Sequence, residues 1–263
     1  MHQRFRAPKW IIATAAASLA ASMSWQAIAA DTKAGGARNV VLVHGAWADG
    51  SSWSKVIPQL EKAGLHVTAI QNPLNSLADD VAATRRAIAL EDGPVILVGH
   101  SYGGAVISDA GVDPKVVGLV YVAAFAPDAG EAIADLGKEF PPAPGGAEIR
   151  PDAAGFLKLT KKGVVESFAQ DLPMAERVVL AATQGPINGA ALGAKLTNAA
   201  WKTKPSWYIV ATNDRMIPPD LERKFAKAMN AKKTVALPTS HVPMLSRPAD
   251  VAQVIIEAAR AAP

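Results

Sequence analysis

The stretch PVILVGHSYGG, residues 94–104, decides the fold of this chain. Residues 94–98 form a short apolar run that predicts a buried strand, and a helix is expected over residues 102–110. Between them, GHSYG matches the pattern G-x-S-x-G, whose glycines leave room for a strained turn that raises a serine above the end of a strand. The stretch therefore predicts Ser101 as a nucleophile, and the alternative is a turn with a structural role only.

Apolar strand patterns and amphipathic helix patterns alternate on both sides of this turn. Strands are predicted at residues 40–43, 66–70, 94–98, 116–123, 206–211 and 234–237. Helices are predicted at residues 52–63, 77–90, 102–110, 220–230 and 248–259. This alternation is typical of an α/β fold with a mainly parallel sheet that helices cover on both faces.

The alternation is interrupted between residues 127 and 204, where no convincing strand pattern is present. PPAPGG at residues 141–146 predicts a loop, and short helical patterns follow at residues 153–159, 164–170 and 174–182. We therefore expect a helical cap, residues 128–204, inserted between two parts of the sheet domain, residues 31–127 and 205–263.

The first thirty residues have the pattern of a secretory signal peptide. A short apolar run at residues 10–21 follows three basic residues, Arg4, Arg6 and Lys9, and small residues close the segment at 27–30. The run is shorter than the roughly 20 residues that span a bilayer, which argues against a single-pass anchor. We expect cleavage between Ala29 and Asp31, and export to the periplasm or the medium by the general secretory route, because no Arg-Arg pair is present.

Composition limits the remaining possibilities. The chain has 263 residues and a formal charge of +4, and removing the three basic residues of the predicted signal leaves about +1. Its basic residues are scattered rather than clustered, so nucleic acid is not an expected partner. There is no cysteine, which excludes a thiol nucleophile and a cysteine-ligated zinc.

A serine nucleophile needs a base, and in folds with this turn the chain order is serine, acid, histidine. Outside the signal the histidines are His44, His66, His100 and His241. Only His241 follows Ser101, in a loop after the last predicted strand. By elimination and position His241 is the predicted base, although a loop histidine by itself is usually a surface residue.

Two aspartates are candidates for the acid that orients the base. Asp214 lies in the turn at residues 212–215, directly after a predicted strand. Asp128 follows the strand predicted at residues 116–123, and its plainer interpretation is a turn or helix cap. We favour Asp214 and keep Asp128 as the alternative.

Acyl transfer also requires two N–H donors for the oxyanion that forms on the substrate. One is expected from the backbone of Tyr102, directly after the nucleophile. The other is expected from Ala46 in the loop that follows the first strand, where Gly45 allows a close backbone approach. The alternative for that loop is an ordinary strand-ending turn.

Five stretches together resemble the plant methylesterase and hydroxynitrile-lyase group of α/β-hydrolases and related bacterial esterases: VVLVHGAWADGSSW at 40–53, PVILVGHSYGG at 94–104, YVAAFAPD at 121–128, NDRMIPP at 213–219 and HVPMLSRP at 241–248. They cover most of the predicted sheet domain and little of the cap. The resemblance implies the α/β-hydrolase fold, with the triad on Ser101, Asp214 and His241 and the oxyanion donors on Ala46 and Tyr102.

Departures from the group limit what the resemblance implies. Plant members usually have a second His-Gly where this chain has Ala48 and Asp49, which argues against plant-hormone methyl esters as substrates. Hydroxynitrile lyases of the group have a threonine at the position of Gly45 and a lysine at the position of Val242, so lyase activity is not expected.

The sequence therefore predicts a serine hydrolase that cleaves small, largely apolar carboxylic esters through an acyl-enzyme, with no metal or organic cofactor. Cofactor-free haloperoxidase or perhydrolase activity, and lactone or amide hydrolysis, are alternatives on the same triad. A ligand-binding protein on a retired hydrolase scaffold is the alternative outside enzymes. The expected partner is a small-molecule ester, no stable membrane insertion is expected after signal removal, and the oligomeric state stays open.

Overall fold

The structure of the chain is a computed structural model that describes residues 36–262. Its main sheet has six parallel strands in the order β2-β1-β3-β4-β8-β9. The strands are β1 (Asn39–Val43), β2 (His66–Ala69), β3 (Val95–His100), β4 (Val116–Val122), β8 (Ser206–Ala211) and β9 (Lys233–Leu237). β1, β3 and β8 are buried along their whole length, as continuous apolar runs require in a sheet covered on both faces. The predicted α/β-hydrolase fold is confirmed.

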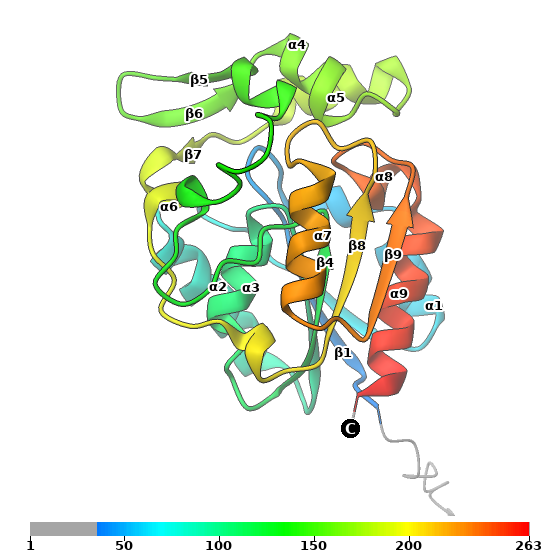
Figure 1. The fold of residues 1–263 in the computed structure, drawn as a ribbon. Helices are drawn as coiled ribbons and strands as arrows, with labels where there is room; N and C mark the ends of the chain where they lie inside the picture. Colours follow the sequence, from blue (N-terminus) through cyan, green and yellow to red (C-terminus); the bar gives the residue numbers. More distant parts are fainter. Residues whose placement is uncertain (1–35, 263) are drawn as a thin grey trace, which may run out of the picture. The chain divides into compact units, whose positions relative to one another are not determined.

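Helices flank this sheet (Figure 1). They are α1 (Ile57–Lys62), α2 (Leu77–Leu90), α3 (Gly103–Ala110), α7 (Pro219–Ala228) and α9 (Pro248–Ala261). α1 packs against α9, α2 packs against α3, and α7 packs on β8. The beginning of α2 is set by Ser76, whose side chain accepts a hydrogen bond from the backbone N–H of Asp79. α2 spans the predicted residues, because its caps and its amphipathic pattern are local.

The single helix predicted over residues 52–63 is wrong. A short 3-10 turn, η1 (Gly50–Trp53), is followed by a separate helix α1. The Asp49 side chain caps the turn, and Pro58 in the first turn of α1 has no N–H with which to continue the hydrogen bonds of a preceding helix.

The segment between β4 and β8 is an insertion, and its middle part, residues 149–183, lies across the end of the main sheet toward which the strands point, at the top of Figure 1. Its helices are α4 (Lys161–Gly163), α5 (Met174–Thr183) and α6 (Gly189–Gly193), with a π-helical turn η4 (Val164–Phe168) and 3-10 turns η2 (Ile133–Asp135), η3 (Pro144–Glu148) and η5 (Ala200–Lys202). The helix predicted at residues 174–182 is confirmed as α5. A short helix α8 (Pro243–Ser246) precedes α9.

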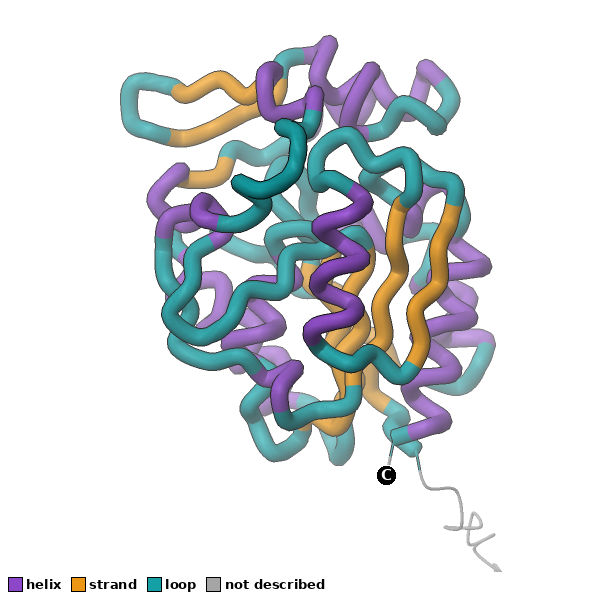
Figure 2. Tube along the Cα trace, viewed as in Figure 1, coloured by secondary structure: helices purple, strands orange, loops and turns teal. Residues whose placement is uncertain are grey.

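The expectation that the insertion lacks strands is wrong. β5 (Ile149–Pro151), β6 (Phe156–Leu159) and β7 (Ile187–Asn188) form a small antiparallel sheet, seen as the separate orange strands in Figure 2. Residues 153–159, predicted as a helix, are a turn and strand β6. Asp152 accepts hydrogen bonds from the N–H groups of Ala154 and Phe156, and Gly155 has a φ of +83°. These short strands gain their hydrogen bonds from partners that sequence periodicity does not reveal.

The predicted signal peptide lies outside the described residues. Within residues 36–262, no helix is long and apolar enough to cross a membrane.

Candidate active site

Ser101 occupies a strained turn between β3 and α3, with a φ of +54°. The left-handed conformation is uncommon for a residue with a side chain and is held here by the surrounding backbone. A Cβ atom on Gly99 would lie 2.6 Å from the carbonyl oxygen of Gly103, and one on Gly103 would lie 2.6 Å from that of Val43. The two glycines of the motif are therefore required by contacts within the turn and with the neighbouring strand.

Ser101, His241 and Asp214 form one chain of hydrogen bonds. Ser101 Oγ lies 2.8 Å from His241 Nε2, and His241 Nδ1 lies 2.5 Å from Asp214 Oδ2. All three residues are buried, and they follow three different parallel strands, β3, β8 and β9, at the same end of the sheet. The fold therefore brings together residues that are 140 and 27 positions apart in sequence.

Asp214 is fixed on both of its oxygens. Oδ1 accepts the backbone N–H groups of Met216 at 2.6 Å and Ile217 at 3.0 Å, which leaves Oδ2 facing His241. This arrangement makes Nδ1 of His241 the protonated nitrogen, because a carboxylate oxygen only accepts. Nε2 is then free to accept the proton of Ser101.

The alternative acid, Asp128, lies elsewhere. Its carboxylate is on the surface, where it forms an ion pair with Lys202 at 2.5 Å and accepts the N–H of Ala129. The hydrogen bond from Lys202 lowers the pKa of Asp128 below its ordinary value. These contacts match the interpretation of Asp128 as a turn residue.

The loop after β1 and the turn at Ser101 present two backbone donors. Among the residues that the structure describes, the N–H groups of Ala46 and Tyr102 have no hydrogen-bond partner. Both residues line a cavity of about 120 Å³ next to Ser101 and His241. The other residues that line it are mostly apolar: Trp47, Phe125, Ile133, Gly146, Ile149, Leu192, Met216 and Ile217.

His44 holds the loop that carries Ala46. Its Nε2 accepts the backbone N–H of Asn72 at 2.8 Å, which assigns the proton to Nδ1, and Nδ1 donates to the carbonyl of Gly45. The Asn72 side chain also donates to the His44 carbonyl. Burial lowers the pKa of His44, so the imidazole is neutral near pH 7.

His100, inside the serine motif, supports the base. Its Nε2 lies 2.7 Å from the backbone carbonyl of His241, to which it donates, and its ring lies 4.8 Å from the His241 ring. Burial, and then the nearby His241, lower the pKa of His100 well below its ordinary value, so it stays neutral. Sequence reasoning missed this role, since the contact joins residues 141 positions apart.

Glu222 is a second buried carboxyl group beside Asp214. It lies on α7, and its Oε2 accepts the backbone N–H of Ala211 at 2.9 Å. Burial, and then the charge of Asp214, raise the pKa of Glu222 well above its ordinary value, against a smaller opposing effect of Arg223. Glu222 therefore keeps its proton to a higher pH than an ordinary glutamate does. The only signal in the sequence was a glutamate at an apolar position of an otherwise amphipathic helix.

Among residues 36–262, no three His, Asp or Glu side chains are grouped so that they could hold a metal ion.

Comparison with known proteins gives the class of protein. The profile of the Alpha/beta hydrolase family matches residues 40–254, and the chain belongs to this family. It is 38% identical over 121 residues to a carbendazim hydrolyzing esterase of Nocardioides sp., a match that covers 40% of this chain and about half (49%) of that protein. It is 27% identical to methylesterase 7 of Arabidopsis thaliana over 84% of this chain and 96% of that one.

Among solved structures, a pyrethroid hydrolase from Sphingobium faniae superposes with a TM-score of 0.73 and 26% identity, covering 86% of this chain and 98% of that one. The resemblance to plant methylesterases and bacterial esterases is confirmed.

Proposed function

We propose that this protein is a serine esterase that cleaves small, largely apolar carboxylic esters by two-step acyl transfer. The observation that carries the proposal is the buried chain of hydrogen bonds from Ser101 through His241 to Asp214. The two N–H groups of Ala46 and Tyr102 beside the same cavity, and the esterases among the relatives, add support.

In the first step His241 Nε2 takes the proton from Ser101 Oγ while that oxygen attacks the ester carbonyl carbon. The negative charge that develops on the carbonyl oxygen is stabilised by the N–H groups of Ala46 and Tyr102, and Asp214 stabilises the imidazolium. His241 then gives its proton to the leaving alcohol. A water molecule repeats the sequence on the acyl-enzyme, which releases the acid and restores Ser101.

The cavity supports a neutral substrate of limited size. At about 120 Å³ it is smaller than the roughly 300–1,000 Å³ of sites that enclose a drug-sized ligand. Its walls are mostly apolar, and they offer no charged side chain, apart from any charge His241 carries, to pair with a charged acyl or alcohol group.

Lyase chemistry is not proposed. A Cβ atom on Gly45, where hydroxynitrile lyases have a threonine, would lie 2.7 Å from the Cβ of Ser101. Val242, where those enzymes have a lysine, is an apolar side chain buried to 1% exposure.

The proposal is tested with Ser101→Ala. We expect the turnover of p-nitrophenyl acetate to fall by about three orders of magnitude or more, with loss of labelling by a fluorophosphonate probe. The circular dichroism spectrum and melting temperature serve as controls for the fold. A variant that kept more than about a tenth of the wild-type rate would remove Ser101 from the mechanism, and a screen of esters beside lactones and amides identifies the preferred bond.

A further inference from the structure

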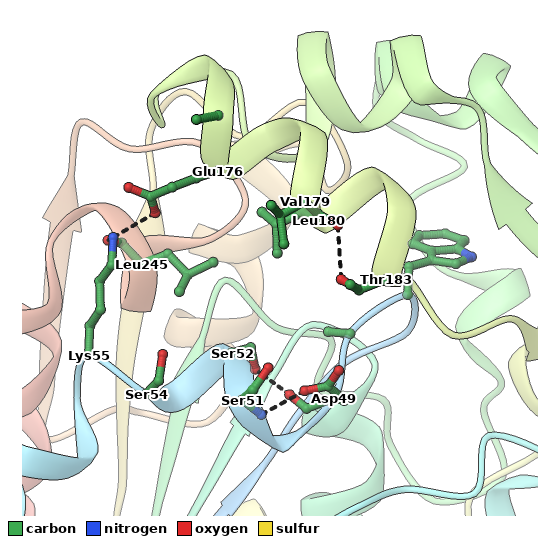
Figure 3. Close-up of a pocket in the computed structure, with 13 residues that line it drawn as sticks. Asp49, Ser51, Ser52, Ser54, Lys55, Glu176, Val179, Leu180, Thr183 and Leu245 are labelled. Carbon is green, nitrogen blue, oxygen red and sulfur yellow. Dashed lines mark hydrogen bonds and ion pairs between the residues drawn. The ribbon is translucent and has the colours of Figure 1, made fainter.

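A second and larger cavity lies beside the Ser101 pocket. It is a groove of about 360 Å³ between α5 of the insertion and the core segment around η1 (Figure 3). Val179 and Leu180 enter it from α5, and Asp49 and Ser52 border it on the core side. Its volume lies within the range of small-molecule sites, whereas that of the Ser101 pocket does not.

Trp47 borders both cavities. It directly follows Ala46, so the residue that borders the two spaces also adjoins a proposed oxyanion donor. Trp47 therefore lies where the Ser101 pocket and the groove adjoin.

The indole is held in this position by the insertion. Its Nε1–H donates to the backbone carbonyl of Leu157 in β6 at 2.9 Å, and its ring packs edge-to-face on Phe168 with centroids 6.5 Å apart. Trp47 is 9% exposed and has a φ of +59°, an uncommon conformation that the surrounding loop imposes.

The groove itself suits an apolar group. Val179 is 58% exposed although it is a large apolar residue, and no residue of α5 is buried. The ion pair between Lys55 and Glu176 joins the core to α5 along one side of the groove, with Nζ and Oε2 2.7 Å apart. The space is thus bordered by apolar side chains of α5, by a charged pair whose charges are already matched and, on the core side, by Asp49 and serine side chains.

We propose that Trp47 is the specificity-determining residue of this site. Its indole limits the ester group bound beside Ser101 to the small pocket, and the groove behind it is the space that a longer apolar acyl chain or alcohol group enters when the indole is removed. This inference rests on the proposed esterase function and names the class of substrate: wild-type protein favours esters with short groups on both sides of the ester bond.

The test compares substrate profiles. The ratio of kcat/KM for octanoyl over acetyl p-nitrophenyl ester, and for octyl over ethyl acetate, is measured for wild type and Trp47→Ala. We expect at least one ratio to rise tenfold or more in the variant. Trp47→Phe keeps an aromatic ring without the Nε1 donor, and its ratios should stay within about threefold of wild type. If Trp47→Ala does not fold, Trp47→Leu takes its place.

A second substitution shows whether the new space is the groove. Val179→Trp fills it from α5, and in the Trp47→Ala background it should return the ratios to within about threefold of wild type. Unchanged ratios in Trp47→Ala, a gain that survives Val179→Trp, or an equal gain in Trp47→Phe would each overturn the inference. Failure of the esterase proposal is distinct, because wild type would then show no Ser101-dependent hydrolysis of any ester.

Discussion

At the scale of single residues, the site depends on how its two carboxyl groups are held. Asp214 receives two backbone N–H groups on one oxygen and turns the other to His241. Glu222 is buried behind it, and its raised pKa disfavours a second negative charge beside Asp214. The carboxyl group of Asp214 thus faces the base, and its orientation is set by the backbone.

We predict that Asp214→Asn lowers kcat/KM by about three orders of magnitude or more. The carbonyl oxygen of asparagine will face the N–H groups of Met216 and Ile217, so its amide NH₂ will face His241 Nδ1. That nitrogen must then accept, which places the proton on Nε2 and prevents it from taking the proton of Ser101. The measurement is steady-state hydrolysis of p-nitrophenyl acetate.

The matched control is Asp128→Asn, which removes the same charge from the surface pair with Lys202. Exposed pairs contribute about 0–1 kcal/mol, so less than a threefold loss of activity is expected. If the two variants ranked in the opposite order, Asp128 would be the acid.

We predict that Glu222→Gln makes the protein more stable than wild type at pH 8. The pKa of Glu222 is higher in the folded protein than in the unfolded chain, where it is 4.5. The contribution of Glu222 to stability is therefore fully present below pH 4.5 and is lost as the pH rises through the pKa of the folded protein. Glutamine carries no such dependence. It can also accept the N–H of Ala211 and offer its amide to the Asp214 side.

Melting temperatures at pH 5, 6.5 and 8 check this prediction, and the difference from wild type should shrink as pH falls. Protonation of the buried His44 and His100 in acid destabilises wild type and variant equally. Their effect therefore cancels in the difference between the two melting temperatures. Asp220→Asn, on the same helix but exposed and paired with Arg223, is the control. A difference that is constant with pH, or a less stable Glu222→Gln at pH 8, contradicts a raised pKa for Glu222.

At the scale of elements, the serine turn depends on how closely α3 packs against its neighbours. A Cβ atom on Gly104, at the start of α3, would lie 2.2 Å from the carbonyl oxygen of Phe125 in the loop after β4. Because the obstacle is backbone, α3 or the loop would have to shift, and Ser101 would move with them.

We predict that Gly104→Ala reduces the free energy of unfolding by about 2 kcal/mol or more, and reduces esterase activity as well. Gly193→Ala is the control, since a Cβ atom on Gly193, in α6, meets nothing within 4 Å; its effect should stay within about 0.5 kcal/mol. Urea denaturation of both variants measures the difference. Equal effects would mean that close packing at α3 is not what requires the glycine.

At the scale of the whole molecule, residues 36–262 of the proposed esterase form one compact unit, and the sequence before them contains the segment that we propose directs export. That segment contributes three of the basic residues and none of the residues of the site. Its removal therefore leaves the proposed chemistry intact.

We predict that the full chain, produced in a bacterium, is recovered outside the cytoplasm with a new N-terminus between Ala29 and Asp31. Mass spectrometry of the fractionated protein gives the cleavage site. When Arg4, Arg6 and Lys9 are changed to glutamate, the chain should stay in the cytoplasm. Retention of the unaltered chain in the cytoplasm would argue against a signal peptide.

Features that local chemistry specifies could be predicted from the amino-acid sequence. The buried strands, helix α2 with its Ser76 cap and the glycine-flanked Ser101 were predictable because each depends on neighbours within a few positions. The position of His241 followed from chain order, which the resemblance to α/β-hydrolases supported.

The remaining features depend on the folded chain. The tertiary structure placed Asp214 rather than Asp128 against His241, joined His100 to the backbone of His241, buried Glu222 beside the acid and placed Trp47 on the lining of two cavities. The short strands of the insertion also pair with one another, although the sequence predicts a helical cap there. Each of these depends on contacts between residues far apart in the chain, and no periodicity or local propensity encodes which distant partner a side chain meets.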